Sequence, residues 1–174
     1  MAARPGMGLI ISNALKRIGS KFDYIILDCP PVLGVLMINA LVACDQLLVP
    51  VQTEHLALKG LERMERTLAM IAKSKNIKPH WMIVPTMFDK RTRASLQALS
   101  TMRQDYAYRV WGSVIPVDTR FRDAAKAGVP LSILGTGYRG AVAYAELLDF
   151  LVGGNLLAER TTRTESTQQL ASAT

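Results

Sequence analysis

Four short apolar runs alternate with longer segments of helical periodicity, and this alternation constrains the fold of the chain most strongly. The runs predict β-strands over residues 24–28, 46–51, 81–84 and 109–115. Apolar residues that follow one another without alternation are typical of strands buried on both faces of a parallel sheet. The sequence therefore predicts a sheet that is covered on both sides.

Helices are predicted between the strands. Residues 56–72 carry Leu61, Met64, Leu68 and Ile71 at helical spacing, with charged residues between them. Weaker patterns predict helices over 9–18, 33–43, 93–106, 122–127 and 141–152. Strands that alternate with helices need crossover connections, so the fold class is α/β with a mostly parallel sheet. In such folds, ligands bind where the strands end.

One domain is predicted over residues 1–152, followed by a tail over 153–174. The tail is rich in Thr, Ser and Gln. This composition cannot bury a core, so we expect the tail to be disordered.

Composition narrows the class of protein. The chain has 49% hydrophobic and 20% charged residues, which is typical of a globular protein. No apolar run approaches the roughly 18 residues of a membrane span, and two cysteines make no disulfide framework, so a reducing cytoplasm is expected. The net charge of +7 is compatible with contact with a polyanion, but an ordinary solvated surface is the commoner explanation of such a charge.

Asp28 ends the first apolar run and is the strongest local sign of chemistry. In a Walker-B arrangement, an aspartate at the end of a buried strand holds Mg²⁺, usually through water. The alternative is an aspartate that caps the next helix or turn. The run and its aspartate alone leave both interpretations open.

A series of motifs resembles the ParA/MinD/Soj family of deviant-Walker ATPases. In chain order they are YIILDCPP (24–31), LG (33–34) with NAL (39–41), VPVQTE (49–54) with LALKGL (56–61), PTMFD (85–89) with RT (91–92), and IPVDTR (115–120). Each motif is moderately specific, but their shared order and spacing are highly specific. The resemblance implies a P-loop NTPase-like three-layer fold in which Asp28 is the Walker-B aspartate.

The resemblance also implies a nucleotide site. It assigns the loop that encloses adenine to Pro116, Val117 and Asp118. It assigns a second loop that contacts the base to Thr86 and Met87. For Pro116, a simple stop to the preceding strand is the structural alternative.

Family members bind DNA without sequence preference as ATP-bound dimers, through basic residues near these loops. The candidates in this chain are Arg91, Arg93, Arg120 and Arg122. Contacts of arginine to phosphate would make the binding sensitive to salt. Ordinary solvated charges are the alternative, and the acidic Asp118 stands where the family loop is usually more basic.

The Gly-rich, Lys-containing phosphate loop that defines the family does not occur in this sequence. The glycine-rich stretch 135–140 has no lysine and no leading strand, so we interpret it as a flexible surface loop. We therefore expect the N-terminal strands and the phosphate loop of the fold to be missing. No catalytic residue is then expected in this chain, and an apolar strand should present an unpaired edge.

By resemblance, the whole protein is expected to bind ATP and Mg²⁺, hydrolyse ATP, form a homodimer when ATP is bound and position a cargo. The cargo would be a chromosome or plasmid locus, or polar chemotaxis or flagellar machinery, with a ParB-like or polar adaptor protein as partner. The expected location is the cytoplasm, at the nucleoid or a pole. The alternative is a catalytically inactive interaction module that retains the partner- or DNA-binding face. No membrane role is expected, because residues 161–174 are too polar for an amphipathic membrane helix.

Overall fold

The computed structural model describes residues 9–30, 34–75 and 80–155. The chain divides into two compact units, one of residues 1–49 and 59–82 and the other of residues 50–58 and 83–174. Within the described ranges, no helix is long and apolar enough to cross a membrane.

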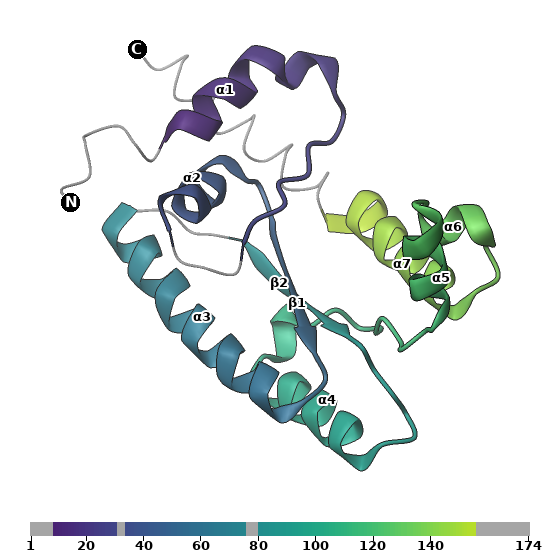
Figure 1. The fold of residues 1–174 in the computed structure, drawn as a ribbon. Helices are drawn as coiled ribbons and strands as arrows, with labels where there is room; N and C mark the ends of the chain where they lie inside the picture. Colours follow the sequence, from purple (N-terminus) through teal and green to yellow (C-terminus); the bar gives the residue numbers. More distant parts are fainter. Residues whose placement is uncertain (1–8, 31–33, 76–79, 156–174) are drawn as a thin grey trace, which may run out of the picture. The chain divides into compact units, whose positions relative to one another are not determined.

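Two paired strands form the regular sheet of the described residues: β1 (Leu47–Gln52) and β2 (Trp81–Thr86). Leu47 N donates to His80 O at 2.8 Å, and Thr53 N donates to Thr86 O at 3.0 Å. The two bonds keep the same register along the strands, as a parallel pair requires. The helix α3 (His55–Lys75) makes the crossover between them (Figure 1). These two strands and this helix confirm the predictions for this part of the chain.

Two helices of the first unit pack against each other (Figure 1): α1 (Ile10–Ile18), which continues into η2 (Gly19–Lys21), and α2 (Val35–Ala43). The buried Asn39 links them. Ile10 N donates to Asn39 Oδ1 at 2.9 Å, and Asn39 Nδ2 donates to Val35 O at 2.8 Å. The first N–H groups of a helix lack a partner within the helix, so Asn39 supplies the cap that the Leu9 side chain does not provide.

The strand predicted over residues 24–28 is wrong. The structure has no strand there, and Ile26 and Tyr24 are 92% and 56% exposed. A strand exists only while a neighbour pairs with its backbone, and in the described part of the chain no strand pairs with this segment. The apolar run therefore lies open to solvent.

The helix α4 (Arg93–Asp105) follows β2 in the second unit and leads into the turn η3 (Ala107–Arg109). Thr92 caps α4, because its Oγ1 accepts a hydrogen bond from Ser95 N at 3.3 Å. Of the strand predicted over 109–115, the described residues show only one isolated parallel bridge, Val110 with Ile83, and a second bridge joins Pro116 to Phe88 directly after it. A bend at residues 112–113 interrupts it, at a glycine that weakens a strand.

Three short helices of the second unit gather in one cluster (Figure 1): α5 (Arg120–Ala127), α6 (Leu131–Leu134) and α7 (Arg139–Phe150), with the π-helical turn η4 (Leu151–Asn155) after them. Ala124, Leu131 and Ala141 form their buried core, and Phe121 packs against it. Gly128 ends α5 at a φ of 67°, in the left-handed region that glycine adopts at least cost.

Two predictions are corrected near the end of the chain. The glycine-rich stretch 135–140 is not a loop throughout, because Arg139 and Gly140 form the first turn of α7. Residues 153–155 of the predicted tail still belong to η4, because the helical backbone continues past α7. Residues 156–174 lie outside the described ranges, so disorder there stays a prediction.

Candidate functional site

Two loops of the second unit join at the ends of their strands. Residues 87–92 follow β2, and residues 116–119 follow the segment beside it. Phe88 N donates to Ile115 O at 3.1 Å, and Val117 N donates to Phe88 O at 2.9 Å. The structure thereby brings the predicted base-contacting residues together, with Thr86 at the end of β2 and the others in the two adjoining loops: Met87, Pro116, Val117 and Asp118. Parallel α/β sheets bind their ligands at this end.

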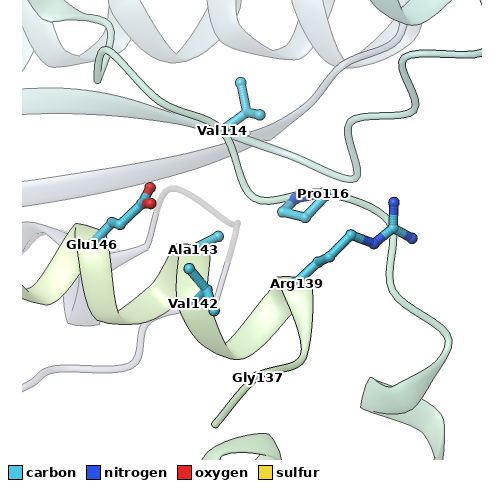
Figure 2. A pocket seen from close by; sticks show the side chains of 7 residues that line it. All are labelled: Val114, Pro116, Gly137, Arg139, Val142, Ala143 and Glu146. Carbon is cyan, nitrogen blue, oxygen red and sulfur yellow. The ribbon is translucent and has the colours of Figure 1, made fainter.

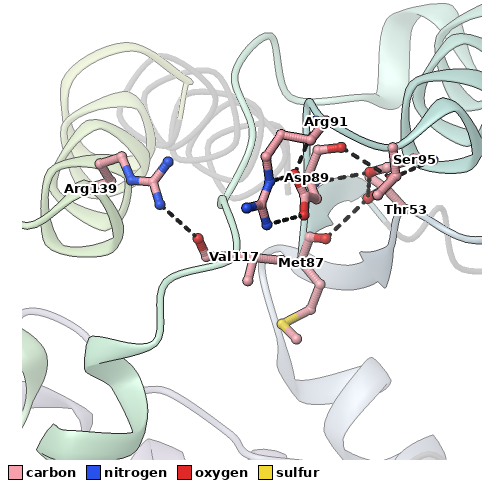
Figure 3. A network of polar contacts seen from close by, with 8 residues as sticks. Thr53, Met87, Asp89, Arg91, Ser95, Val117 and Arg139 are labelled. Atoms are coloured by element: carbon pink, nitrogen blue, oxygen red, sulfur yellow. Dashed lines mark hydrogen bonds and ion pairs between the residues drawn. The ribbon is translucent and has the colours of Figure 1, made fainter.

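Met87 has an unusual backbone. Its φ is 54°, the one positive value outside glycine within the described residues, and the residue is 55% exposed. A side chain with a Cβ adopts this left-handed region only at a cost. Thr53 Oγ1 donates to Met87 O at 3.4 Å. Figure 3 shows the Met87 carbonyl turned toward Thr53 and the Met87 side chain pointing away from it.

Thr53 and Ser95 form a buried hydroxyl pair beneath this loop. Both residues are 4% exposed, and their Oγ atoms are 2.6 Å apart. Asp89 N donates to Ser95 Oγ at 3.1 Å. This pair was not predicted from the sequence. The one signal in the sequence was a hydroxyl residue directly after an apolar run, and nothing there pointed to its partner.

Asp89 forms a two-pronged ion pair with Arg91. Arg91 Nε donates to Asp89 Oδ1 at 2.9 Å, and Nη2 donates to Oδ2 at 2.7 Å. These side-chain bonds, helped by one from the Arg91 backbone, lower the pKa of Asp89 to about 2, and the same pairing raises the pKa of Arg91. The charge of this predicted DNA-binding arginine is therefore matched by a neighbouring acid.

Asp118 uses both carboxylate oxygens inside the protein. Oδ1 accepts from Arg120 N and Oδ2 accepts from Gly140 N, each at 3.0 Å. These backbone bonds, with Arg120 as the larger cause, lower the pKa of Asp118. The carboxylate thus ties the loop 116–119 to the first turn of α7. A contact of Asp118 with the nucleotide base stays a prediction. Each carboxylate oxygen accepts one hydrogen bond within the protein and has a second lone pair for such a contact.

An open pocket of about 250 Å³ adjoins Pro116 (Figure 2). Its lining is mostly apolar, with one basic and one acidic side chain from α7, and consists of Val114, Pro116, Gly137, Arg139, Val142, Ala143 and Glu146. Arg139 Nη2 donates to Val117 O at 3.4 Å, and Glu146 Oε2 accepts from Ser113 Oγ at 3.2 Å. Arg139 was not predicted as a site residue, because the glycine-rich stretch around it was expected to be a surface loop.

The predicted DNA-binding arginines differ in how much of their charge is free. Arg120 contacts Asp123 at 3.2 Å, and its guanidinium lies 5.3 Å from the centre of the Tyr138 ring. Arg91 is paired with Asp89. Within the described residues, Arg93 and Arg122 make no ion pair and no side-chain hydrogen bond, and both are exposed. These two arginines are therefore free to meet an anion.

Asp28 belongs to the first unit and is exposed. The described ranges hold no group of three or more His, Cys, Asp or Glu residues that could bind a metal ion. A single exposed carboxylate nevertheless suits Mg²⁺, which keeps several waters and takes other oxygens from substrate phosphates. The assignment of Asp28 to Mg²⁺ stays a prediction.

Known proteins match this chain over most of its length. A family model described as "AAA domain" matches residues 2–80. Sporulation initiation inhibitor protein Soj of Bacillus subtilis is 36% identical over 140 residues, which cover 79% of this chain and 54% of Soj. Chromosome partitioning protein ParA of Myxococcus xanthus is 32% identical over 139 residues, which cover 79% of this chain and 49% of ParA.

Among solved structures, cobyrinic acid a,c-diamide synthase from Mycobacterium smegmatis with a bound ATP analogue and magnesium matches with a TM-score of 0.68. It is 30% identical, and the match covers 87% of this chain and 58% of that one. The chain belongs to the ParA/MinD family of P-loop ATPases. The predicted α/β, P-loop NTPase-like fold class is thereby confirmed. This ParA/MinD-family chain spans about half the length of the relatives it matches.

Proposed function

We propose that this ParA/MinD-family chain is part of an ATPase that binds Mg²⁺ and ATP, hydrolyses ATP, dimerises around it and positions a cargo such as a chromosome. The observation that carries the proposal is the joining of two loops through Phe88, which presents Thr86, Met87 and residues 116–118 together at the ligand-binding end of the sheet. The name of the Myxococcus xanthus relative, chromosome partitioning protein ParA, supports a role in partitioning, and the synthase with its ATP analogue and magnesium supports the choice of ligands.

In this proposal the second unit holds the base of the nucleotide. The backbone of residues 116–118 contacts the edge of adenine, and Met87 lies against the ring. Asp28 holds a water ligand of Mg²⁺, and the metal, when bound, neutralises charge on the phosphate oxygens. The phosphates themselves need backbone donors and a lysine that are not among the motifs of this sequence.

Non-specific DNA and a ParB-like or polar adaptor are the proposed partners, and the cytoplasm is the proposed location. Exposed arginines beside the loops support DNA as a partner, and in the described part of the chain Arg93 and Arg122 are free of ion pairs. ATP-dependent dimerisation would place two copies of this surface on one duplex.

The test uses the whole protein. Calorimetry should show binding of Mg²⁺ and ATP, and light scattering should show the mass of a dimer with ATP and of a monomer without it. A folded protein that binds no ATP would contradict the proposal and favour the inactive interaction module.

A further inference from the structure

A chain of hydrogen bonds runs under the loop that follows β2 (Figure 3). Thr53 Oγ1 donates to Met87 O at 3.4 Å, and a hydroxyl group has only one proton. The 2.6 Å bond between the two hydroxyls must therefore be donated by Ser95 to Thr53. Ser95 Oγ in turn accepts from Asp89 N at 3.1 Å. In this assignment each of the two hydroxyl groups donates one hydrogen bond and accepts one.

The hydrogen-bonded hydroxyls of Ser95 and Thr53 end at the backbone carbonyl of Met87, the strained residue of the loop. Thr53 bonds to both sides of the junction between β2 and the loop, because its backbone N donates to O of Thr86, the last residue of β2, at 3.0 Å and its hydroxyl donates to Met87 O. Met87 has a φ of 54°, while its side chain is 55% exposed. A strained residue persists only where its surroundings fix it, and such residues concentrate at functional sites.

Helix capping does not account for the buried pair. Thr92 already caps α4, since its Oγ1 accepts from Ser95 N at 3.3 Å. The turn before α4 has its own bonds, with Thr92 N and Thr92 Oγ1 both donating to Asp89 O at 3.1 and 3.2 Å. The hydroxyls of Thr53 and Ser95 are therefore left to set the position of residues 87–89.

We propose that Thr53 and Ser95 are positioning residues: their buried hydroxyl pair holds Met87 in its left-handed conformation and so presents the Met87 side chain to the adenine ring. This inference rests on the proposed ATP-binding function. The thioether of methionine packs favourably against aromatic rings, which suits a nucleobase. Neither Thr53 nor Ser95 touches the nucleotide in this proposal.

The first measurement compares two ligands on the whole protein. Thr53→Val keeps the shape of the side chain and removes the hydroxyl. The affinity for ATP should fall about tenfold, a typical effect of losing one buried hydrogen bond, while the affinity for inorganic tripolyphosphate should change less than about twofold. Thr53→Ser should restore ATP binding. As a control, Thr67→Val removes an exposed hydroxyl bonded to Arg63 O, and it should change neither affinity.

An equal loss of affinity for both ligands in Thr53→Val would overturn the inference, since a general structural defect does not distinguish a nucleobase. So would an unchanged affinity for ATP. Ser95→Ala gives a second, independent route to the same comparison, in case the valine variant does not fold.

The second measurement needs no nucleotide. Ser95→Ala removes the acceptor of the Asp89 amide, so exchange of that amide with solvent should speed up about tenfold or more by NMR. Thr53→Val should shift the signal of the Met87 methyl group. If the wild type binds no ATP, the proposed function fails and the presentation of Met87 to adenine fails with it. If ATP binds but Asp89 exchange and the Met87 signal stay unchanged in both variants, only the positioning role of the pair is overturned.

Discussion

Asp89 and Asp118 show how carboxylates near the candidate site are held in their charged form. Each accepts backbone N–H bonds, and Asp89 also pairs with a guanidinium. Hydrogen bonds to the charged form of an acid lower its pKa. At the residue scale, the structure therefore gives a dependence of stability on pH.

Asp89 should stabilise the folded protein only where its carboxylate is charged. Its pKa falls from an ordinary value of 3.8 to about 2 on folding, so its contribution is complete above about pH 4 and is lost as the pH falls toward 2. Urea unfolding from pH 7 to pH 2 should show the wild type more stable than Asp89→Asn, with the difference vanishing near pH 2. A difference that stays constant down to pH 2 would contradict this account. Asp23→Asn, which changes an exposed aspartate, is the control.

Elements were predictable where their pattern is local. The spacing of apolar residues that predicts α3 and the apolar runs that predict β1 and β2 each lie within one short stretch of the chain. The sequence alone therefore located these three elements. The segment 24–28 was not predictable, because a strand also needs a partner that its own sequence does not specify. The site shows the same limit. Motifs located both loops, whereas Thr53 and Ser95 meet only through the fold, 42 residues apart in the chain.

Packing of α7 on α5 and α6 depends on the missing side chain of Gly140. A Cβ at this position would lie 2.5 Å from Phe121 Cε2 and 3.0 Å from Leu131 Cδ2. Gly140→Ala should therefore destabilise the protein by about 1–3 kcal/mol in urea unfolding, as overpacking does. Gly60→Ala is the matched control, because nothing lies within 4 Å of its added Cβ. A helix prefers alanine to glycine, so Gly60→Ala should stabilise α3 by about 0.5–1 kcal/mol. Equal effects at the two positions would refute the packing argument.

At the scale of the whole molecule, the positive charge of the protein affects whether DNA can be a partner. The net charge of +7 favours a polyanion, and the arginines near the loops differ in their pairing. In a salt titration of ATP-dependent binding to random duplex DNA, Arg93→Ala and Arg122→Ala should each lower the log–log slope by about one. Arg91→Ala should lower it less, because Asp89 already pairs with that charge. An unchanged slope in Arg93→Ala and Arg122→Ala would remove both residues from the DNA surface.

Hydrolysis of ATP by the whole protein is the measurement that decides whether this chain belongs to a Mg²⁺-dependent ATPase. Asp28→Asn keeps the size of the side chain and removes the charge that Mg²⁺ needs, so Mg²⁺-dependent turnover should fall to background. Asp23→Asn alters an exposed aspartate of the same segment and should leave turnover unchanged. We expect turnover in the wild type and in Asp23→Asn and none in Asp28→Asn. Equal turnover in the two variants would contradict this expectation.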